Sequence, residues 1–265
     1  MTCSSTVNEN RDALPSLLDA KPKKPHLRPL LIVLGGMFVC FVATILFFPW
    51  IADQMMTANA RAIGERGHDI VVAINDANRI RAISALPSVW PRTFLAITNH
   101  PGDISAKTFQ TSSEYFYELY DGGNVDSDQH KPYIKGFNYG KLAGVGVNAK
   151  CFAGPLTATN NMWIIAANIT DEDDPRIPLL ITRNVDVVEI ERIVNKGLKA
   201  SEFEKRLEFS KPRNPPFGDK QMVFVYRNGK FRILRCNNRK LGAFFGNKEL
   251  PPRDPSKPPI VYLMP

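Results

Sequence analysis

The chain has 265 residues, of which 44% are hydrophobic and 23% are charged, and it carries a formal net charge of +8 at pH 7. Basic and acidic residues are interleaved between 186 and 220 and form no concentrated basic stripe, which argues against nucleic-acid binding. The length allows one folded domain of about 200 residues beside a tail and an apolar segment.

The first predicted element is a transmembrane helix over residues 29–52. Its central 23 residues, Leu30 to Ala52, include no ionisable side chain and would extend about 34 Å as a helix, enough to cross a bilayer. A secretory signal has a shorter apolar region, although Ala58-Asn59-Ala60 resembles a signal-peptidase site. A buried core helix would carry a polar face, and here only Thr44 offers one.

The flanking charges predict the orientation of this helix. Residues 1–28 are polar, which is typical of a disordered tail, and they contain five Lys/Arg against three acidic residues. After the apolar segment, the only basic residues within about 15 positions are Arg61 and Arg66. We therefore expect a cytoplasmic tail and an extracytoplasmic domain over 53–250.

The helix is predicted to continue beyond the membrane to about Ala85. Apolar residues recur there at helical spacing, and most charged residues lie on other faces. The stripe consists of Met56, Ile63, Ile70, Ile74, Ala77 and Ile80. Gly64 and Gly67 should weaken this helix by about 1 kcal/mol each, and Leu86-Pro87 should end it. Such a stripe needs a partner, which we expect to be a sheet formed by the rest of the chain.

The remaining chain is predicted to combine strands with short helices. Thr111–Glu114 has the spacing of a capping box and should begin a helix that ends at Gly122-Gly123. Strands are predicted at 162–167 and 177–182, joined by a turn. Asp186–Glu189 again has capping spacing and predicts a second helix.

A hairpin and an irregular tail complete the prediction. Met222, Phe224 and Tyr226 alternate with Val223 and Val225, and Asn228-Gly229 is typical of a type I′ turn leading into a second strand at 231–234. Residues 251–265 are rich in proline and are predicted to form an irregular tail. The expected fold class is α+β, with a long N-terminal helix whose amphipathic half packs on an antiparallel sheet.

No motif in the sequence nominates catalysis. It contains no G-x-S-x-G, P-loop or H-E-x-x-H pattern, and its four histidines lie in unlike surroundings. Trp90 and Trp163 are expected in the core rather than on a binding surface. Cys151 and Cys236 either pair in an oxidising compartment or remain two separate thiols. The protein is therefore predicted not to be an enzyme.

Three stretches carry a resemblance to a known family: GHDIVVAINDANRIRAISALPSVWP (67–91), NNMWIIAANITDEDDPRIPLLITRN (160–184) and NPPFGDKQMVFVYRNGKFRIL (214–234). With the preceding apolar helix, they resemble type IV pilins and the pseudopilins of type II secretion, in particular large divergent G-like proteins. The resemblance covers most of residues 30–236 and rests on the order of elements.

One departure from the family pattern lies in the apolar helix. Pilins are cleaved before a helix whose fifth residue is Glu, whereas here the nearest junction is Gly36-Met37 and Cys40-Phe41 occupies the position of the acid. An uncompensated N-terminal charge at that depth would cost several kcal/mol. The departure favours a stably anchored relative over a fibre subunit. Gly36, Cys40 and Ala43 form a face of small side chains that either contacts another helix or is merely tolerated in lipid.

The resemblance also bears on the acidic run between the two predicted strands. Related pseudopilins carry calcium in a sheet loop, and this run offers four carboxylates, Asp171, Glu172, Asp173 and Asp174. The alternative, a solvated turn before Pro175, is favoured because the ligand spacing of an EF-hand is missing. No other cofactor is expected.

The resemblance implies a non-enzymatic, pilin-like or pseudopilin-like structural protein of a bacterial cell envelope, linked to type II secretion. It would be a single-pass protein of the inner membrane with a cytoplasmic N-terminus. Its partners through the N-terminal helix would be the lipid bilayer and other pilin-like subunits or a secretion apparatus. The alternatives are a membrane-tethered extracytoplasmic ligand-binding module and, less favoured, a membrane-anchored hydrolase.

Overall fold

The computed structural model describes residues 27–94, 103–121, 156–209 and 216–265. Its contacts divide the chain into two compact units, 1–52 and 53–265, which we describe separately. Helix α1, Leu27–Ile83, contributes to both units and contains Pro49. The prediction of one long helix that ends before Leu86-Pro87 is therefore confirmed.

The second unit is built around a five-stranded antiparallel sheet with the strand order β4-β3-β2-β1-β5. Its strands are β1 (Trp163–Ala167), β2 (Pro178–Thr182), β3 (Gln221–Tyr226), β4 (Phe231–Arg235) and β5 (Val261–Leu263). The helices besides α1 are α2 (Ser112–Asp121), α3 (Val188–Lys196) and the short α4 (Leu241–Phe244). Single 3-10 turns lie at Ile104–Ala106, Ala200–Glu202 and Cys236–Asn238. The α+β class and the antiparallel sheet agree with the sequence prediction.

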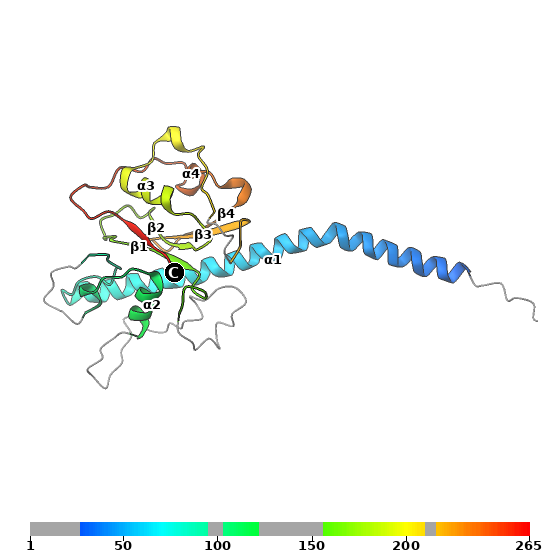
Figure 1. Ribbon diagram of the computed structural model, residues 1–265, viewed down its shortest axis with the longest axis horizontal. Helices are drawn as coiled ribbons and strands as arrows, with labels where there is room; N and C mark the ends of the chain where they lie inside the picture. Colours follow the sequence, from blue (N-terminus) through cyan, green and yellow to red (C-terminus); the bar gives the residue numbers. More distant parts are fainter. Residues whose placement is uncertain (1–26, 95–102, 122–155, 210–215) are drawn as a thin grey trace, which may run out of the picture. The chain divides into compact units, whose positions relative to one another are not determined.

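Both faces of the sheet are covered, which explains why β1, β2 and β3 are buried throughout. The second half of α1 and helix α2 lie on one side of the sheet, and α3 and α4 lie on the other (Figure 1). Trp163 is paired with Thr182 in the register of β1 and β2, and the ring of Trp163 lies against Gly67 of α1, so these two side chains share the α1 side. Phe224 points the other way and meets Phe244 of α4 with 4.2 Å between ring centroids.

Two glycines of α1 set how closely the helix approaches the sheet. A Cβ at Gly67 would lie 2.5 Å from Val225 and 2.8 Å from the ring of Trp163, and one at Gly64 would lie 2.3 Å from Phe231. The glycines therefore do more than weaken the helix, because a Cβ at either position would force its neighbour to move, and at Gly67 those neighbours are buried. Sequence reasoning identified their cost but missed this packing role.

The predicted stripe of α1 is correct in its centre and wrong at its end. Ile63, Ile70 and Ile74 are at most 1% exposed, and Ala77 is buried as well, whereas Ile80 is 62% exposed. The steps from Ile74 to Ala77 and on to Ile80 are three residues each. Each falls about 60° short of a full turn, so Ile80 lies about 120° away from Ile74 around the helix.

The hairpin between β3 and β4 is confirmed, but its predicted turn type is wrong. Tyr226 N donates to Lys230 O and Gly229 N donates to Tyr226 O, each at 2.8 Å, so the loop contains three residues rather than two. Gly229 has φ +79°, and Asn228 is not among the residues with positive φ. This arrangement fits a turn followed by a glycine bulge, the alternative that an Asn-Gly pair also permits.

The ends of the short helices show one success and one failure. At α2, Thr111 N donates to the Glu114 carboxylate and Glu114 N donates to the Thr111 hydroxyl, which is the predicted capping box. At α3 the helix is present but the box is not. Asp186 instead accepts a hydrogen bond from Val188 N, and the Glu189 carboxylate pairs with Arg192.

The prediction of an irregular tail over 251–265 is wrong at its end. The proline-rich stretch is irregular, but Val261–Leu263 forms strand β5 and pairs with β1. Ser112 N of α2 donates a hydrogen bond of 2.7 Å to Met264 O, which ties the last residues to a second element. A proline before an edge strand does not prevent pairing, because the strand itself contains no proline.

Candidate functional site

The apolar half of α1 is the first functional feature. Among the described helices, only this one is long and apolar enough to cross a membrane. Large side chains are exposed along it, including Phe38 at 67%, Phe48 at 66% and Trp50 at 62%. None of its most apolar window is buried by other described residues.

The acidic loop between β1 and β2 forms ion pairs with several different basic residues. Glu172 pairs with Lys257 at 2.6 Å, and Asp174 pairs with Arg176 at 2.6 Å. Burial alone would raise the pKa of Asp174, but hydrogen bonds from Arg176 and its charge outweigh burial and hold that pKa below its ordinary value.

The other two carboxylates of the loop also have partners. Asp171 accepts a hydrogen bond from the Trp90 indole at 3.0 Å. Asp173 and Arg253 form an ion pair at 3.2 Å with side chains only 6% and 5% exposed. Within the described ranges, no cluster of three or more His, Cys, Asp or Glu side chains is arranged to hold a metal ion. The geometry matches the turn interpretation, and calcium binding stays a prediction.

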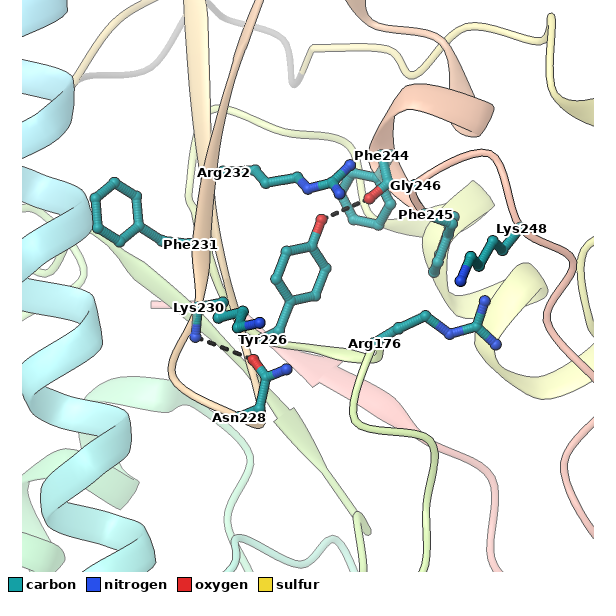
Figure 2. A pocket seen from close by; sticks show the side chains of 10 residues that line it. All are labelled: Arg176, Tyr226, Asn228, Lys230, Phe231, Arg232, Phe244, Phe245, Gly246 and Lys248. Carbon is teal, nitrogen blue, oxygen red and sulfur yellow. Dashed lines mark hydrogen bonds between the residues drawn. The ribbon is translucent and has the colours of Figure 1, made fainter.

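A basic pocket of about 320 Å³ lies where the β3–β4 hairpin faces the residues after α4 (Figure 2). We call it the basic pocket; its lining residues include four cationic side chains, Arg176, Lys230, Arg232 and Lys248, and no carboxylate. Aromatic rings of Tyr226, Phe244 and Phe245 complete its walls, whereas the ring of Phe231 points away from the pocket towards Gly64 of α1 (Figure 2).

Hydrogen bonds hold the walls of the basic pocket in place. The Tyr226 hydroxyl donates to Phe244 O at 2.5 Å, and Arg232 Nη1 donates to Ala243 O at 2.7 Å. Burial raises the pKa of Tyr226 to about 12, against a smaller opposing effect of the Arg232 charge, so the hydroxyl is neutral at physiological pH. Sequence analysis did not find this pocket, because its cations come from separate segments and form no motif.

The tryptophans, histidines and cysteines named from the sequence lie partly inside and partly outside the described residues. Trp90 and Trp163 are at most 2% exposed, which confirms their place in the core. His68 lies against Gly229, with 2.8 Å between its Nδ1 and the Gly229 carbonyl oxygen. Cys236 is exposed, while its predicted partner Cys151 lies outside the described residues, as do His26, His100 and His130.

Comparisons with models of protein families, with curated proteins and with solved structures find no match to this chain. Function therefore has to be argued from the site geometry and from the sequence.

Proposed function

We propose that the protein is a non-enzymatic, membrane-anchored structural subunit of a bacterial cell envelope, of the pilin-like or pseudopilin-like kind. In this proposal the apolar half of α1 spans the inner membrane with the N-terminus in the cytoplasm. The domain that begins at Asp53 is then extracytoplasmic, and α1 contacts other subunits or a secretion apparatus within the membrane.

The main support is that α1 has two roles, an exposed apolar segment in its first half and a core helix in its second half. Its first half exposes large apolar side chains, and its second half is part of the core of the second unit, where Ile63 and Ile70 are buried. A flexible tether would not need to enter the core of the domain that it carries. A helix that is both anchor and core element suits a subunit that assembles through this helix.

Cysteine cross-linking in membranes tests assembly through α1. We expect a variant that retains only Cys40, on the face of small residues with Gly36 and Ala43, to form disulfide-linked dimers on mild oxidation. A matched variant that retains only Cys236, which is exposed on the folded domain, should remain monomeric under the same conditions. Monomers only in the Cys40 variant would refute assembly through this face.

A second candidate function is a membrane-tethered extracytoplasmic ligand-binding module. The basic pocket favours it, because the pocket is concave, combines aromatic walls with a few polar groups and reaches the size of small-molecule sites. In this alternative α1 serves as the anchor, and the Cys40 variant would stay monomeric while the pocket binds its ligand.

A further inference from the structure

We infer that the basic pocket binds a small polyvalent oxyanion, meaning a compact molecule with two or more phosphate or carboxylate charges. The inference specifies the ligand class for the second candidate function. It does not depend on assembly through α1, since every lining residue belongs to the unit that begins at Asp53.

The charge balance of the pocket is the first argument. Arg176 is neutralised by Asp174 at 2.6 Å, and its Nη1 donates to Glu249 O. Lys230, Arg232 and Lys248 line the same space and form no ion pair with any carboxylate in the described part of the chain. Three uncompensated cations around one concavity repel each other, and an anion with several charges would relieve that repulsion.

Nearby carboxylates do not cancel this charge. Glu249 follows Lys248 directly, but its carboxylate accepts a hydrogen bond from Ala200 N at 2.9 Å and does not line the pocket. Asp174 accepts hydrogen bonds from the Arg176 guanidinium through both of its carboxylate oxygens. The pocket therefore presents basic groups to a ligand without a competing internal anion.

Arg232 is held in position for such a ligand. Its Nη1 donates to Ala243 O, and its Nη2 lies 3.2 Å from the point that a Cβ of Gly246 would occupy. Gly246 has φ +73°, a conformation that favours glycine, and it leaves room for the guanidinium beside the backbone. A cation fixed before binding loses less side-chain entropy when the ligand arrives.

The aromatic walls limit the size and the mode of binding. Phe244 contacts Phe245 with 4.5 Å between ring centroids, and the Tyr226 hydroxyl proton is committed to Phe244 O. Recognition must then come mainly from the three cations, since the tyrosine does not donate to the ligand. A volume of about 320 Å³ suits a small molecule rather than a macromolecular segment.

Calorimetric titration of the full-length chain in an uncharged detergent tests the inference, with sodium pyrophosphate and sodium citrate as separate probes. We expect saturable 1:1 binding of at least one probe, and the tighter probe identifies phosphate or carboxylate as the preferred group. In Lys230→Gln with Lys248→Gln, binding should weaken at least about tenfold, because two charge-assisted contacts are lost.

A matched control removes the same charge elsewhere. Lys196→Gln with Lys220→Gln changes two exposed lysines outside the pocket and should bind like the wild type. Arg232→Lys keeps the charge but loses the guanidinium fixed by Ala243 and should also weaken binding. Circular dichroism verifies folding of each variant. The inference is overturned if neither probe binds, or if the pocket and control variants bind equally well. None of these outcomes changes the conclusion from Cys40 cross-linking, so the two proposals can fail independently.

Discussion

Gly67 is the residue at which helix propensity and packing make opposite demands. Alanine there would favour the isolated helix by about 1 kcal/mol, but its Cβ would lie 2.5 Å from the buried Val225 and 2.8 Å from Trp163. Overpacking of this kind costs about 1–3 kcal/mol. We expect Gly67→Ala to lower the free energy of unfolding, measured by denaturant titration of the second unit's tryptophan fluorescence.

Gly64 and Gly36 supply the controls for this change. Gly64→Ala meets Phe231, which is partly exposed at the sheet edge and can move, so its cost should be smaller. Gly36→Ala has no neighbour within 4 Å in the chain and should leave the stability of the second unit unchanged. Equal stability of the Gly67→Ala and Gly36→Ala variants would contradict the packing role of Gly67.

Asp173 and Glu172 are adjacent in the acidic loop but differ in burial. Asp173→Asn leaves Arg253 with a buried charge and no counter-ion, which costs about 3–5 kcal/mol. Glu172→Gln removes an ion pair in which the carboxylate is 79% exposed, and such pairs are worth at most about 1 kcal/mol. Thermal unfolding of both variants checks the difference. If calcium raised the melting temperature of the wild type but not of Asp173→Asn, the loop would be a calcium site.

The lowered pKa of Asp103 should make the stability of the fold decrease at acidic pH. Burial opposes its charge, but hydrogen bonds from Ser105 and Arg81 outweigh burial and hold its pKa below the ordinary value. A lowered native pKa stabilises the fold above the unfolded pKa of about 4, and this contribution is lost as pH falls through the native value. Unfolding measured between pH 6 and 3 should show a steeper loss in the wild type than in Asp103→Asn. Parallel curves would exclude Asp103 as a source of acid sensitivity.

The elements that sequence predicted best are those with a strong local period. The apolar run of α1, the hairpin around Asn228-Gly229 and the capping box of α2 depend on neighbouring residues, and all three are present in the structure. The failures have two different causes. Strand β5 exists because β1 offers an edge for pairing, which no local pattern contains. Ile80 is exposed because two steps of three residues place it about 120° around the helix from Ile74, which helical geometry alone could have shown.

Strand β5 should contribute substantially to stability despite its short length. Tyr262 and Leu263 are each 4% exposed, and the Tyr262 hydroxyl donates to Pro178 O at 2.8 Å. Removal of residues 261–265 exposes these surfaces and the edge of β1, so we expect a loss of at least about 3 kcal/mol. Removal of Pro265 alone keeps the bond from Ser112 N to Met264 O and should be nearly neutral. Chemical denaturation of both truncations measures the difference, and two equally stable truncations would show that β5 is dispensable.

For the whole molecule, sequence analysis found the long apolar helix but not the basic pocket. An apolar helix is recognisable because its signal is contiguous along the chain, and the same holds for the acidic loop. The basic pocket is lined by residues near 176, 230 and 247, which are neighbours only because β3 pairs with β4 and α4 packs beside them. In the sequence these basic residues resemble ordinary surface charge. Only the fold shows which of them have acidic partners.

The proposed orientation of the chain in the membrane rests on the charges that flank the apolar helix and can be tested with native cysteines. In bacterial spheroplasts, a membrane-impermeant maleimide should label a variant that retains only Cys236, which is exposed on the folded unit. A variant that retains only Cys3 should react only after permeabilisation, because the basic tail is expected in the cytoplasm. Mass spectrometry of the N-terminus in the same sample distinguishes an intact anchor from cleavage near Ala60. Labelling of Cys3 in intact spheroplasts would reverse the proposed orientation, and loss of residues 1–60 would replace the anchored protein by a secreted one.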